Sequence, residues 1–412
     1  MHKKVLKGGI KITLHKKSHT SGINSNIVIG IDGNEANEVR SDIGAPAGVN
    51  VYALELLRAI NKLQDIVYGK YEVVVYLKNK PSSLLPKAHK YFKYSVLGGG
   101  GLWVLSKLTP RLIAEKRNGS APNVFLSLSH YAPVFVPLPK AASIMDLGYH
   151  RNSAHLKRLD YWQLKYWTAS TISLVDRLFS ISDSVKNNIV RHYPGSKSKI
   201  VVTPLAYDGV VFNKNTKAKV LAKNKLFKAK HSIGQKYVLY LGVIKPSKNV
   251  EGLVTAWKQL CDEYPKISLV IGGKKSWGFK NVWDVVVRLG LQNKIIFTDY
   301  VKEEDKAALI SGAYLFVLPS FWEGFGLDIL NAMACGVPVA ASNIAAIPEV
   351  AGKAGVLFDP ENPEDIAKKI SEVLDLDSDK YKELSKKSIE QASKFSWEKT
   401  AKKTIENLVN II

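Results

Sequence analysis

Cysteine is scarce in this sequence, and long apolar runs are missing from it. The chain of 412 residues has two cysteines, Cys261 and Cys335, which are too few for a disulfide framework and suit a reducing compartment. No stretch approaches the roughly 18 consecutive apolar residues of a membrane helix, and the run at 27–31 is too short for a signal peptide. The sequence therefore predicts a cytoplasmic protein that is soluble or peripheral on the inner face of a membrane.

Acidic residues are also in short supply, most of all in the first half. The net charge is +23. Residues 1–205 hold 29 lysines and arginines against 12 acidic residues, and 206–412 hold 30 against 24. A basic half predicts an anionic partner such as a membrane surface or a phosphorylated acceptor, whereas charge that serves solubility alone is the competing interpretation. No recognition motif supports nucleic acid as the partner.

Strand-like and helix-like segments alternate from residue 28 onward, after an arm at 1–25 that lacks periodicity. This alternation predicts βαβ units and parallel sheets. The expected strands are 28–32, 71–77, 123–128, 142–145, 177–181, 200–203, 237–241, 268–271, 295–298, 315–318 and 337–340. The expected helices are 49–63, 182–193 (capped by Ser182 or Asp183), 249–264, 282–289, 304–311 and 327–334.

The lysine-rich segment 214–230 interrupts the alternation and is predicted to be a connector or surface loop. Two α/β domains follow, at 1–207 and from 208 onward. Ligands of such sheets bind beyond the carboxyl ends of the strands, so we expect the site in the cleft between the domains.

The segment 319–338 carries the strongest chemical signal. A strand runs into a loop with Glu323, Gly324 and Gly326 and then into a helix, and such a loop lets backbone N–H groups approach a phosphate or a polyol. Glu323 is a good acceptor for sugar hydroxyls. Asn331 lies eight positions on, which predicts that it shares a helix face with Glu323. A βα turn with a capping glutamate is the alternative interpretation.

Residues 318–340 resemble the signature of the family 4 retaining glycosyltransferases, also called glycosyl transferases group 1, and of their mannosyltransferase-like members. The resemblance extends over roughly 28–412. It implies the GT-B fold, which is an α/β fold of two Rossmann-like domains with parallel sheets that face across a cleft. It also implies that 208–393 binds the nucleotide-sugar, that 394–412 crosses back to the first domain, and that Glu323 contacts the donor sugar. Asn331 replaces the glutamate that holds the ribose in the family.

Two further segments resemble the diphosphate contacts of the family. Lys248 follows a strand and precedes a helix, where a cation suits a diphosphate, and the resemblance assigns it to the leaving group. The usual arginine is absent, and Lys245 is a substitute that lacks bidentate geometry. Gly48 stands in a glycine-rich loop before a helix, like the family's loop beside the diphosphate. Solvated lysines and a plain helix cap are the alternatives.

The acceptor side departs from the family at one position. The family has a histidine where this chain has Met145, and Asp146 after it is kept. His130 and His150 lie nearby in the sequence, and each is a candidate to replace the missing histidine or an ordinary surface or core residue. The basic, aromatic stretch 91–116 is interpreted either as a membrane-facing acceptor surface or as an ordinary helix with a core face.

The resemblance implies retaining transfer of a hexose from GDP-mannose or a UDP-sugar to a glycan or lipid-linked acceptor. No metal or cofactor is expected. Lys248, Lys245 and the backbone amides of Gly324, Phe325, Gly326 and Leu327 would stabilise the leaving diphosphate. The alternatives are a glycosyltransferase-like protein that binds nucleotide-sugar without turnover, which Met145 and Asn331 suggest, and a binder of anionic surfaces.

Overall fold

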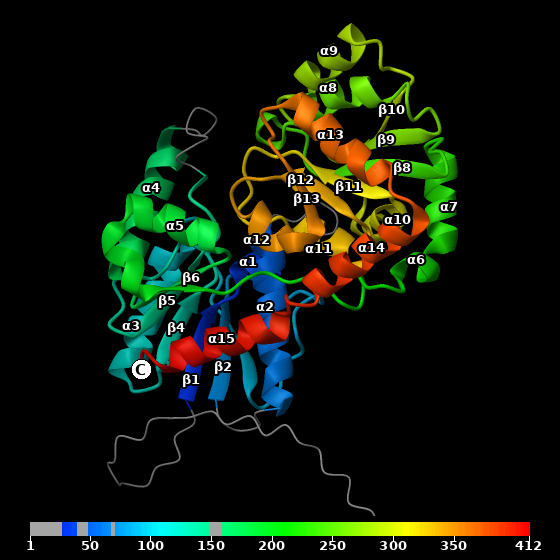
Figure 1. Ribbon diagram of the computed structural model, residues 1–412. Coiled ribbons are helices and arrows are strands. Elements are labelled where there is room, and N and C mark those ends of the chain that lie inside the picture. The colour runs from blue at the N-terminus through cyan, green and yellow to red at the C-terminus, as the bar shows by residue number, and fades with distance from the viewer. Residues whose placement is uncertain (1–26, 39–47, 67–70, 149–157) are drawn as a thin grey trace, which may run out of the picture.

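Two sheets of parallel strands form the protein (Figure 1). The computed structural model describes residues 27–38, 48–66, 71–148 and 158–412. One sheet has seven strands in the order β3-β2-β1-β4-β5-β6-β7, and the other has six in the order β10-β9-β8-β11-β12-β13. In each sheet the chain starts near the middle and winds outward in both directions, which is the doubly wound arrangement. The predicted α/β class is confirmed.

The first sheet comes from the first half of the chain. The unpredicted edge strand β3 pairs with β2, and its partly exposed sequence lacks the apolar run that identified its neighbours. The strands are β1 (Ile27–Asp32), β2 (Tyr71–Leu77), β3 (Phe92–Val96), β4 (Val124–Ser127), β5 (Lys140–Ile144), β6 (Arg177–Ser180) and β7 (Ile200–Val202). The helices are α1 (Asn34–Asn37), α2 (Gly48–Ile66), α3 (Thr109–Arg117), α4 (Arg158–Leu174) and α5 (Asp183–His192).

The second sheet begins after residue 230. β11 and α11 have the predicted bounds, whereas β13, α12, α13 and α14 were not predicted. Its strands are β8 (Lys236–Leu241), β9 (Ile267–Gly272), β10 (Ile295–Asp299), β11 (Leu315–Leu318), β12 (Val339–Ser342) and β13 (Gly355–Phe358). Its helices are α8 (Val250–Leu260), α9 (Phe279–Arg288), α10 (Glu303–Gly312), α11 (Leu327–Ala334), α12 (Ile347–Ala351), α13 (Pro363–Leu374) and α14 (Ser378–Ala392).

The prediction that 214–230 is a connector or loop was wrong. The segment forms α6 (Thr216–Lys219) and α7 (Leu221–Lys230), and α7 packs against α10. The contact is made through a polar residue, because the buried Asn224 donates to the Ala308 carbonyl at 2.8 Å and to the Tyr237 hydroxyl at 3.3 Å. A helix held by a buried amide shows no apolar stripe, so the sequence pattern missed it.

One interpretation of the basic, aromatic stretch 91–116 expected an ordinary helix, but the stretch does not form a single helix. It contains β3, a π-helical turn (Val104–Leu108) and α3. Trp103, Leu108 and Leu112 are buried in a small core with Tyr76 and Phe125, so these side chains face the interior. No helix in the described part of the chain is long and apolar enough to cross a membrane.

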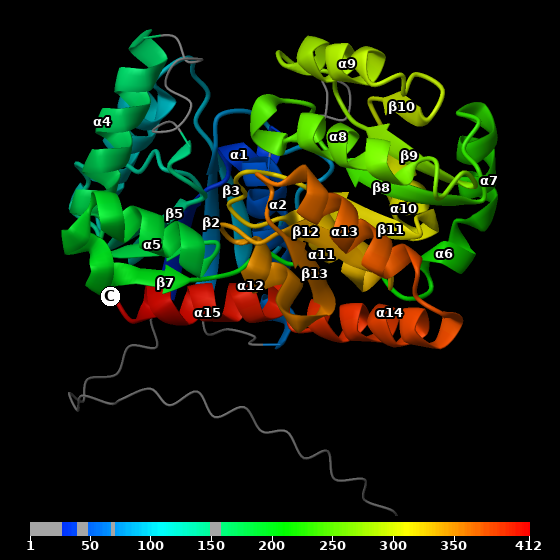
Figure 2. The ribbon, with the colours of Figure 1, turned by 45° about the horizontal axis from the view of Figure 1, so that its top comes forward.

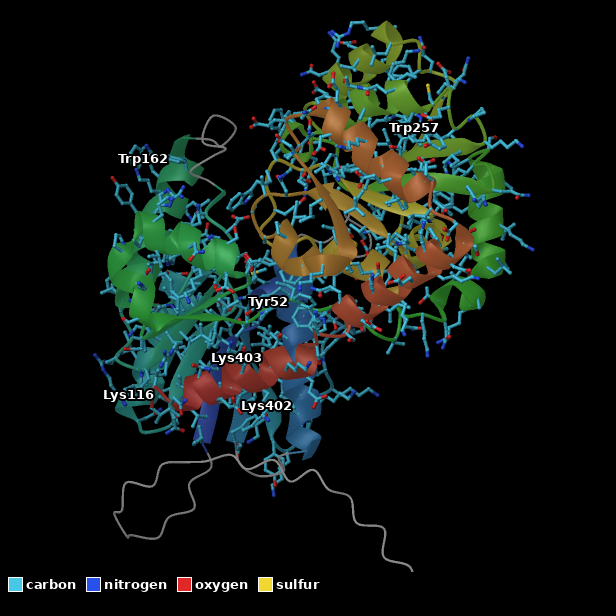
Figure 3. All side chains as sticks on the ribbon, viewed as in Figure 1. Tyr52, Lys116, Trp162, Trp257, Lys402 and Lys403 are labelled. Carbon is cyan, nitrogen blue, oxygen red and sulfur yellow. The ribbon has the colours of Figure 1, made fainter. Side chains whose placement is uncertain are left out.

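The last helix, α15 (Trp397–Val409), packs on α2 of the first sheet. Figure 2 shows α14 and α15 following one another along one side of the molecule. Thr400 donates a hydrogen bond of 2.5 Å to the Pro204 carbonyl. The rings of Tyr52 and Trp397 lie 6.2 Å apart, and Tyr52 lies beside α15 in Figure 3. The end of the chain therefore ties the second sheet to the first.

Candidate active site

The loop between β11 and α11 forms the centre of the candidate site. β11 carries it to the carboxyl edge of the second sheet, where ligands of parallel sheets bind. Gly326 ends the loop with φ of 101°, a conformation that favours glycine, and α11 starts at the next residue. The Phe321 amide donates to the Ser247 carbonyl at 3.0 Å, which joins this loop to the loop after the neighbouring strand β8.

An ion pair spans these two loops. Lys248 Nζ lies 2.5 Å from Glu323 Oε1, and the Ser320 hydroxyl donates to the same oxygen at 2.7 Å. The side chains are 21% and 14% exposed, so the charges meet in a small, partly shielded pocket. The pocket is lined by Tyr240, Leu241, Gly242, Lys248, Leu318, Glu323, Gly326, Leu327 and Asp328.

Local structure places Lys248 at this pocket. Pro246–Lys248 form a 3-10 turn, and Asn249 follows with φ of 52°. The Asn249 side chain accepts from the Gly252 amide at 3.2 Å, which caps α8, and donates to the Pro360 carbonyl at 2.7 Å. A positive φ suits asparagine better than most side chains, so the turn holds its shape and directs Lys248 toward Glu323.

Lys245 and Asp146 lie within electrostatic range of the pair. Burial lowers the pKa of the Lys245 ammonium, and the charge of Lys248 lowers it further. Glu323 and Asp146 raise the same pKa. Since Asp146 follows β5 of the first sheet, residues from both sheets meet at this site. The structure thus brings together Glu323, Lys248, Lys245 and Asp146, which the sequence selected from distant segments.

The other residues predicted to contact the donor differ in which of their atoms a ligand could reach. Gly326 and Leu327 line the pocket, where α11 begins and its free amides favour an anion. The Phe325 side chain is buried against Phe395, with ring centroids 5.7 Å apart, so only its backbone can serve a ligand. Gly48 is the first residue of α2, and no described atom lies within 4 Å of where its Cβ would be. The other residues of the predicted loop, 39–47, lie outside the described residues.

The prediction that Glu323 and Asn331 share a helix face was wrong. Glu323 lies in the loop, and α11 begins only at Leu327. The left-handed conformation of Gly326 separates the loop from the helix, so helical periodicity does not connect the two residues. Asn331 is buried on α11, one turn beyond Leu327, and it is not among the described residues that line the pocket.

Asp146, for which the resemblance implies a place on the acceptor side, is accessible beside the loop between β11 and α11. Asp146 is exposed, and its Oδ1 accepts from the Gly148 amide at 2.8 Å. A Cβ on Gly324 would lie 3.1 Å from the Met145 carbonyl oxygen, so the backbones of the two loops touch. Met145 therefore contributes its main chain to this contact.

Of the two nearby histidines, the structure describes only His130, because His150 lies outside the described residues. Burial lowers the pKa of His130 to about 4, so the ring is neutral at physiological pH. Its Nε2 is buried without a hydrogen-bond partner among the described residues. Nothing in this geometry shows that His130 takes over the role of the missing histidine.

Sequence analysis missed several titratable groups around the site. Asp328 lines the pocket, and burial raises the pKa of its carboxyl, while Lys306 and Lys248 counteract this. Burial also raises the pKa of Tyr240 well above its usual value, and Glu323 adds to the effect. These positions follow no motif in a single sequence. Among the described residues, no group of three or more His, Cys, Asp or Glu could hold a metal ion.

Comparison with solved structures identifies the fold. Sucrose-phosphate synthase from Thermosynechococcus elongatus superposes with a TM-score of 0.69 at 18% identity, over 92% of this chain and 98% of that one. Anabaena HepE in complex with UDP and glucose superposes with a TM-score of 0.68 at 16% identity, over 93% and 100%. The two sheets of parallel strands are those of the GT-B class of glycosyltransferase folds.

Sequence comparisons point to the same group of enzymes. Residues 222–394 match the family model of the glycosyl transferases group 1. O-antigen chain mannosyltransferase B of Escherichia coli is 36% identical over 235 residues, which are 55% of this chain and 59% of that protein. A serotype-specific mannosyltransferase of Escherichia coli is 29% identical over 58% of this chain. The match covers 29% of that longer relative, so neither relative is matched over two thirds of its length.

Asp32, at the carboxyl end of β1, makes the stability of the protein depend on pH. Burial raises the pKa of its carboxyl to about 7, against 3.8 for the free group. Between these two pKa values the folded protein keeps a proton on Asp32 that the unfolded chain has released. The free energy of unfolding therefore falls as the pH rises toward 7 and through it. Asp32→Asn cannot titrate. We expect the free energy of unfolding of this variant to rise relative to that of wild type by about 1–3 kcal/mol between about pH 5 and about pH 8.

Denaturant unfolding of both proteins across this pH range measures the effect. Asp379→Asn is the control, because that carboxylate is 93% exposed. A difference between Asp32→Asn and wild type that stays constant with pH would contradict the shifted titration.

Proposed function

We propose that the protein is a retaining glycosyltransferase that moves mannose from GDP-mannose to a glycan or lipid-linked acceptor. The Lys248–Glu323 ion pair near the start of α11 is the observation that carries the proposal, because a cation beside a carboxylate suits a ligand with a diphosphate next to sugar hydroxyls. The names of the Escherichia coli relatives favour mannose as the sugar. The HepE complex contains UDP and glucose, so a UDP-sugar is the competing donor.

The proposed chemistry divides between charge stabilisation and orientation. As the bond between the anomeric carbon and the diphosphate oxygen breaks, the diphosphate keeps the electron pair. Lys248, Lys245 and the amides at the start of α11 stabilise its growing charge, a task that the proposal gives to these groups rather than to a metal. Glu323 accepts hydrogen bonds from sugar hydroxyls and orients the anomeric carbon.

The acceptor is proposed to approach from the side of the first sheet, where Asp146 borders the cleft. The acceptor hydroxyl oxygen bonds to the anomeric carbon on the face from which the diphosphate leaves. The proton of this hydroxyl passes to an oxygen of the leaving phosphate. Because no side-chain base takes this proton, the route tolerates Met145 at the position of the family's histidine. Contact between the loops at Gly324 and Met145 helps to exclude water.

Two variants separate the roles of the paired residues in donor binding. We expect wild type to bind GDP-mannose with a micromolar Kd, about −8 kcal/mol. Glu323→Ala should weaken GDP-mannose roughly 10- to 100-fold by losing the sugar contact. It should leave GDP binding unchanged or stronger, since Lys248 is released from its partner. Lys248→Ala should weaken both ligands.

Isothermal titration calorimetry in the presence of a chelator measures these affinities, with UDP-glucose as the competing donor. Glu383→Ala is the control, because that carboxylate lies on α14 and is 63% exposed. If Glu323→Ala lost GDP as strongly as GDP-mannose, the sugar would not be the partner of Glu323. If wild type bound neither donor, the proposal would fail.

The product should keep the anomeric configuration of the donor. GDP-α-mannose and a mannose-terminated acceptor should give an α-linked product, because attack occurs on the face that the diphosphate leaves. The one-bond C–H coupling at the new anomeric centre distinguishes the two anomers by NMR. A β-linked product would refute retention. Donor binding with no product from any tested acceptor would favour the alternative of a glycosyltransferase-like binder.

We propose that the acceptor is presented at an anionic membrane surface and that α4 faces this surface. Trp162 and Tyr166 on α4 are 39% and 63% exposed, and their stacked rings lie 5.4 Å apart. Lys165 Nζ lies 4.9 Å from the Trp162 ring centroid, and Figure 3 shows Trp162 at the outer edge of α4. Exposed aromatic rings beside a cation are typical of helices that rest on the interface of anionic bilayers.

Replacing both rings in Trp162→Ala/Tyr166→Ala should lower binding to vesicles that contain phosphatidylglycerol by roughly tenfold. Flotation of the protein with these vesicles measures binding, and neutral vesicles should retain little of it. Trp283→Ala on α9, where the ring is 41% exposed, controls for the loss of any surface aromatic. Equal binding of wild type and the double variant would reject this membrane surface.

A further inference from the structure

The start of α5 is held by a side chain from the other sheet. α5 follows β6 at the carboxyl edge of the first sheet, and its first free amides are those of Asp183 and Ser184. These amides donate to the Glu349 carboxylate at 2.8 and 2.6 Å. Glu349 belongs to α12 of the second sheet. A carboxylate at a helix N-terminus pairs with unsatisfied amides and with the positive end of the helix dipole.

The residue that caps α5 directly contacts the loop between β11 and α11, residues 319–326, which is the donor loop of the proposed function. Ser182 is the N-cap, as predicted, and its hydroxyl oxygen accepts from the Val185 amide at 3.0 Å. The same hydroxyl donates to the Gly324 carbonyl at 2.8 Å. Gly324 has little room for a side chain, because a Cβ there would lie 3.1 Å from the Met145 carbonyl oxygen and 3.4 Å from Ile181. The donor loop therefore rests against the ends of β5 and β6.

A third contact joins the first two. The Ala346 amide, at the start of α12, donates to the Glu323 carbonyl at 3.4 Å. Glu349 lies one turn further along the same helix. The donor loop, α12 and the start of α5 thus form a closed ring of hydrogen bonds that passes from the second sheet to the first and back.

We propose that Ser182 and Glu349 are positioning residues for sugar transfer, and that this ring, the clasp, closes the cleft and fixes the donor loop in one step. The assignment to transfer rests on the proposed function. Gly324 is the neighbour of Glu323, so the hydrogen bond from Ser182 limits movement of the loop that carries the sugar-binding carboxylate. When the clasp opens, the acceptor side separates from this loop and water enters.

The clasp can open because one of its two side chains, the Glu349 carboxylate, is exposed to water. Ser182 is buried, whereas Glu349 is exposed at the rim of the contact. When the sheets separate, water can replace the Glu349 carboxylate at the α5 amides, and the Ser182 hydroxyl keeps its hydrogen bond from the Val185 amide. Such a contact suits a cleft that admits a donor and releases a nucleoside diphosphate in each cycle.

Distance measurement between the two halves of the molecule tests closure without any donor. Spin labels at Lys116→Cys on α3 and Lys280→Cys on α9 lie at exposed positions, and the native cysteines are buried. We expect Glu349→Ala to shift the distance distribution from the clasped state to more open states. Glu349→Gln, which keeps one acceptor oxygen, should give an intermediate shift. If Glu349→Ala gave the same distance distribution as the labelled protein that keeps Glu349, the clasp would be overturned.

Asp377→Ala is the matched control for loss of a helix-capping carboxylate. Asp377 accepts from the Asp379 and Lys380 amides at 3.0 and 2.8 Å at the start of α14, within one half of the molecule. It should leave the distance distribution unchanged. A shift of the same size in Asp377→Ala would show that any lost cap has this effect, and it would overturn the specific role of Glu349.

Kinetics then connects the clasp to transfer. With GDP-mannose as donor, Glu349→Ala should lower kcat/KM for transfer roughly five- to twentyfold and raise the fraction of donor lost to hydrolysis, with partial rescue in Glu349→Gln. An unchanged ratio of hydrolysis to transfer overturns the link to catalysis. If wild type binds no donor, the proposed function fails, whereas the distance measurement still decides whether the clasp exists.

Discussion

The ion pair between Lys248 and Glu323 is the interaction on which the candidate site depends. It joins the loops that follow β8 and β11, two neighbouring strands of the second sheet. Both charged side chains are largely removed from water, and an unpaired charge in such surroundings would be costly. Each residue therefore holds the other in place until an anionic ligand competes for the lysine. Under the proposed function, this pocket is preorganised for a donor that carries negative charge beside hydroxyl groups.

Two kinds of contact join the two sheets. In the first, α15 packs along α2, and Thr400 bonds to Pro204. In the second, Glu349 and Ser182 join the sheets through a few hydrogen bonds beside the donor loop. The helix contact buries apolar side chains, whereas the rim contact can exchange with water. The clasp is therefore the contact expected to break when the cleft opens, while α15 stays packed on α2.

Strands and the helices next to them were predictable because buried parallel strands are short apolar runs. β11 and α11 have the predicted bounds, and the glycines between them were correctly placed in a loop. α7 was missed because a buried amide at Asn224 holds it rather than an apolar stripe. The expected shared face of Glu323 and Asn331 failed because Gly326 turns the chain before α11 begins.

The sequence by itself determined the alternation of strands and helices, the α/β class and the segments that supply the donor loop, since periodicity and glycine placement are local properties. It also selected Glu323, Lys248, Lys245 and Asp146 as site candidates. Only the tertiary structure decided that Lys248 pairs with Glu323, that Asn331 lies away from the pocket lining, and that Glu349 reaches α5 across the cleft. These contacts join residues that are far apart in the chain, and their distances depend on how the two sheets pack.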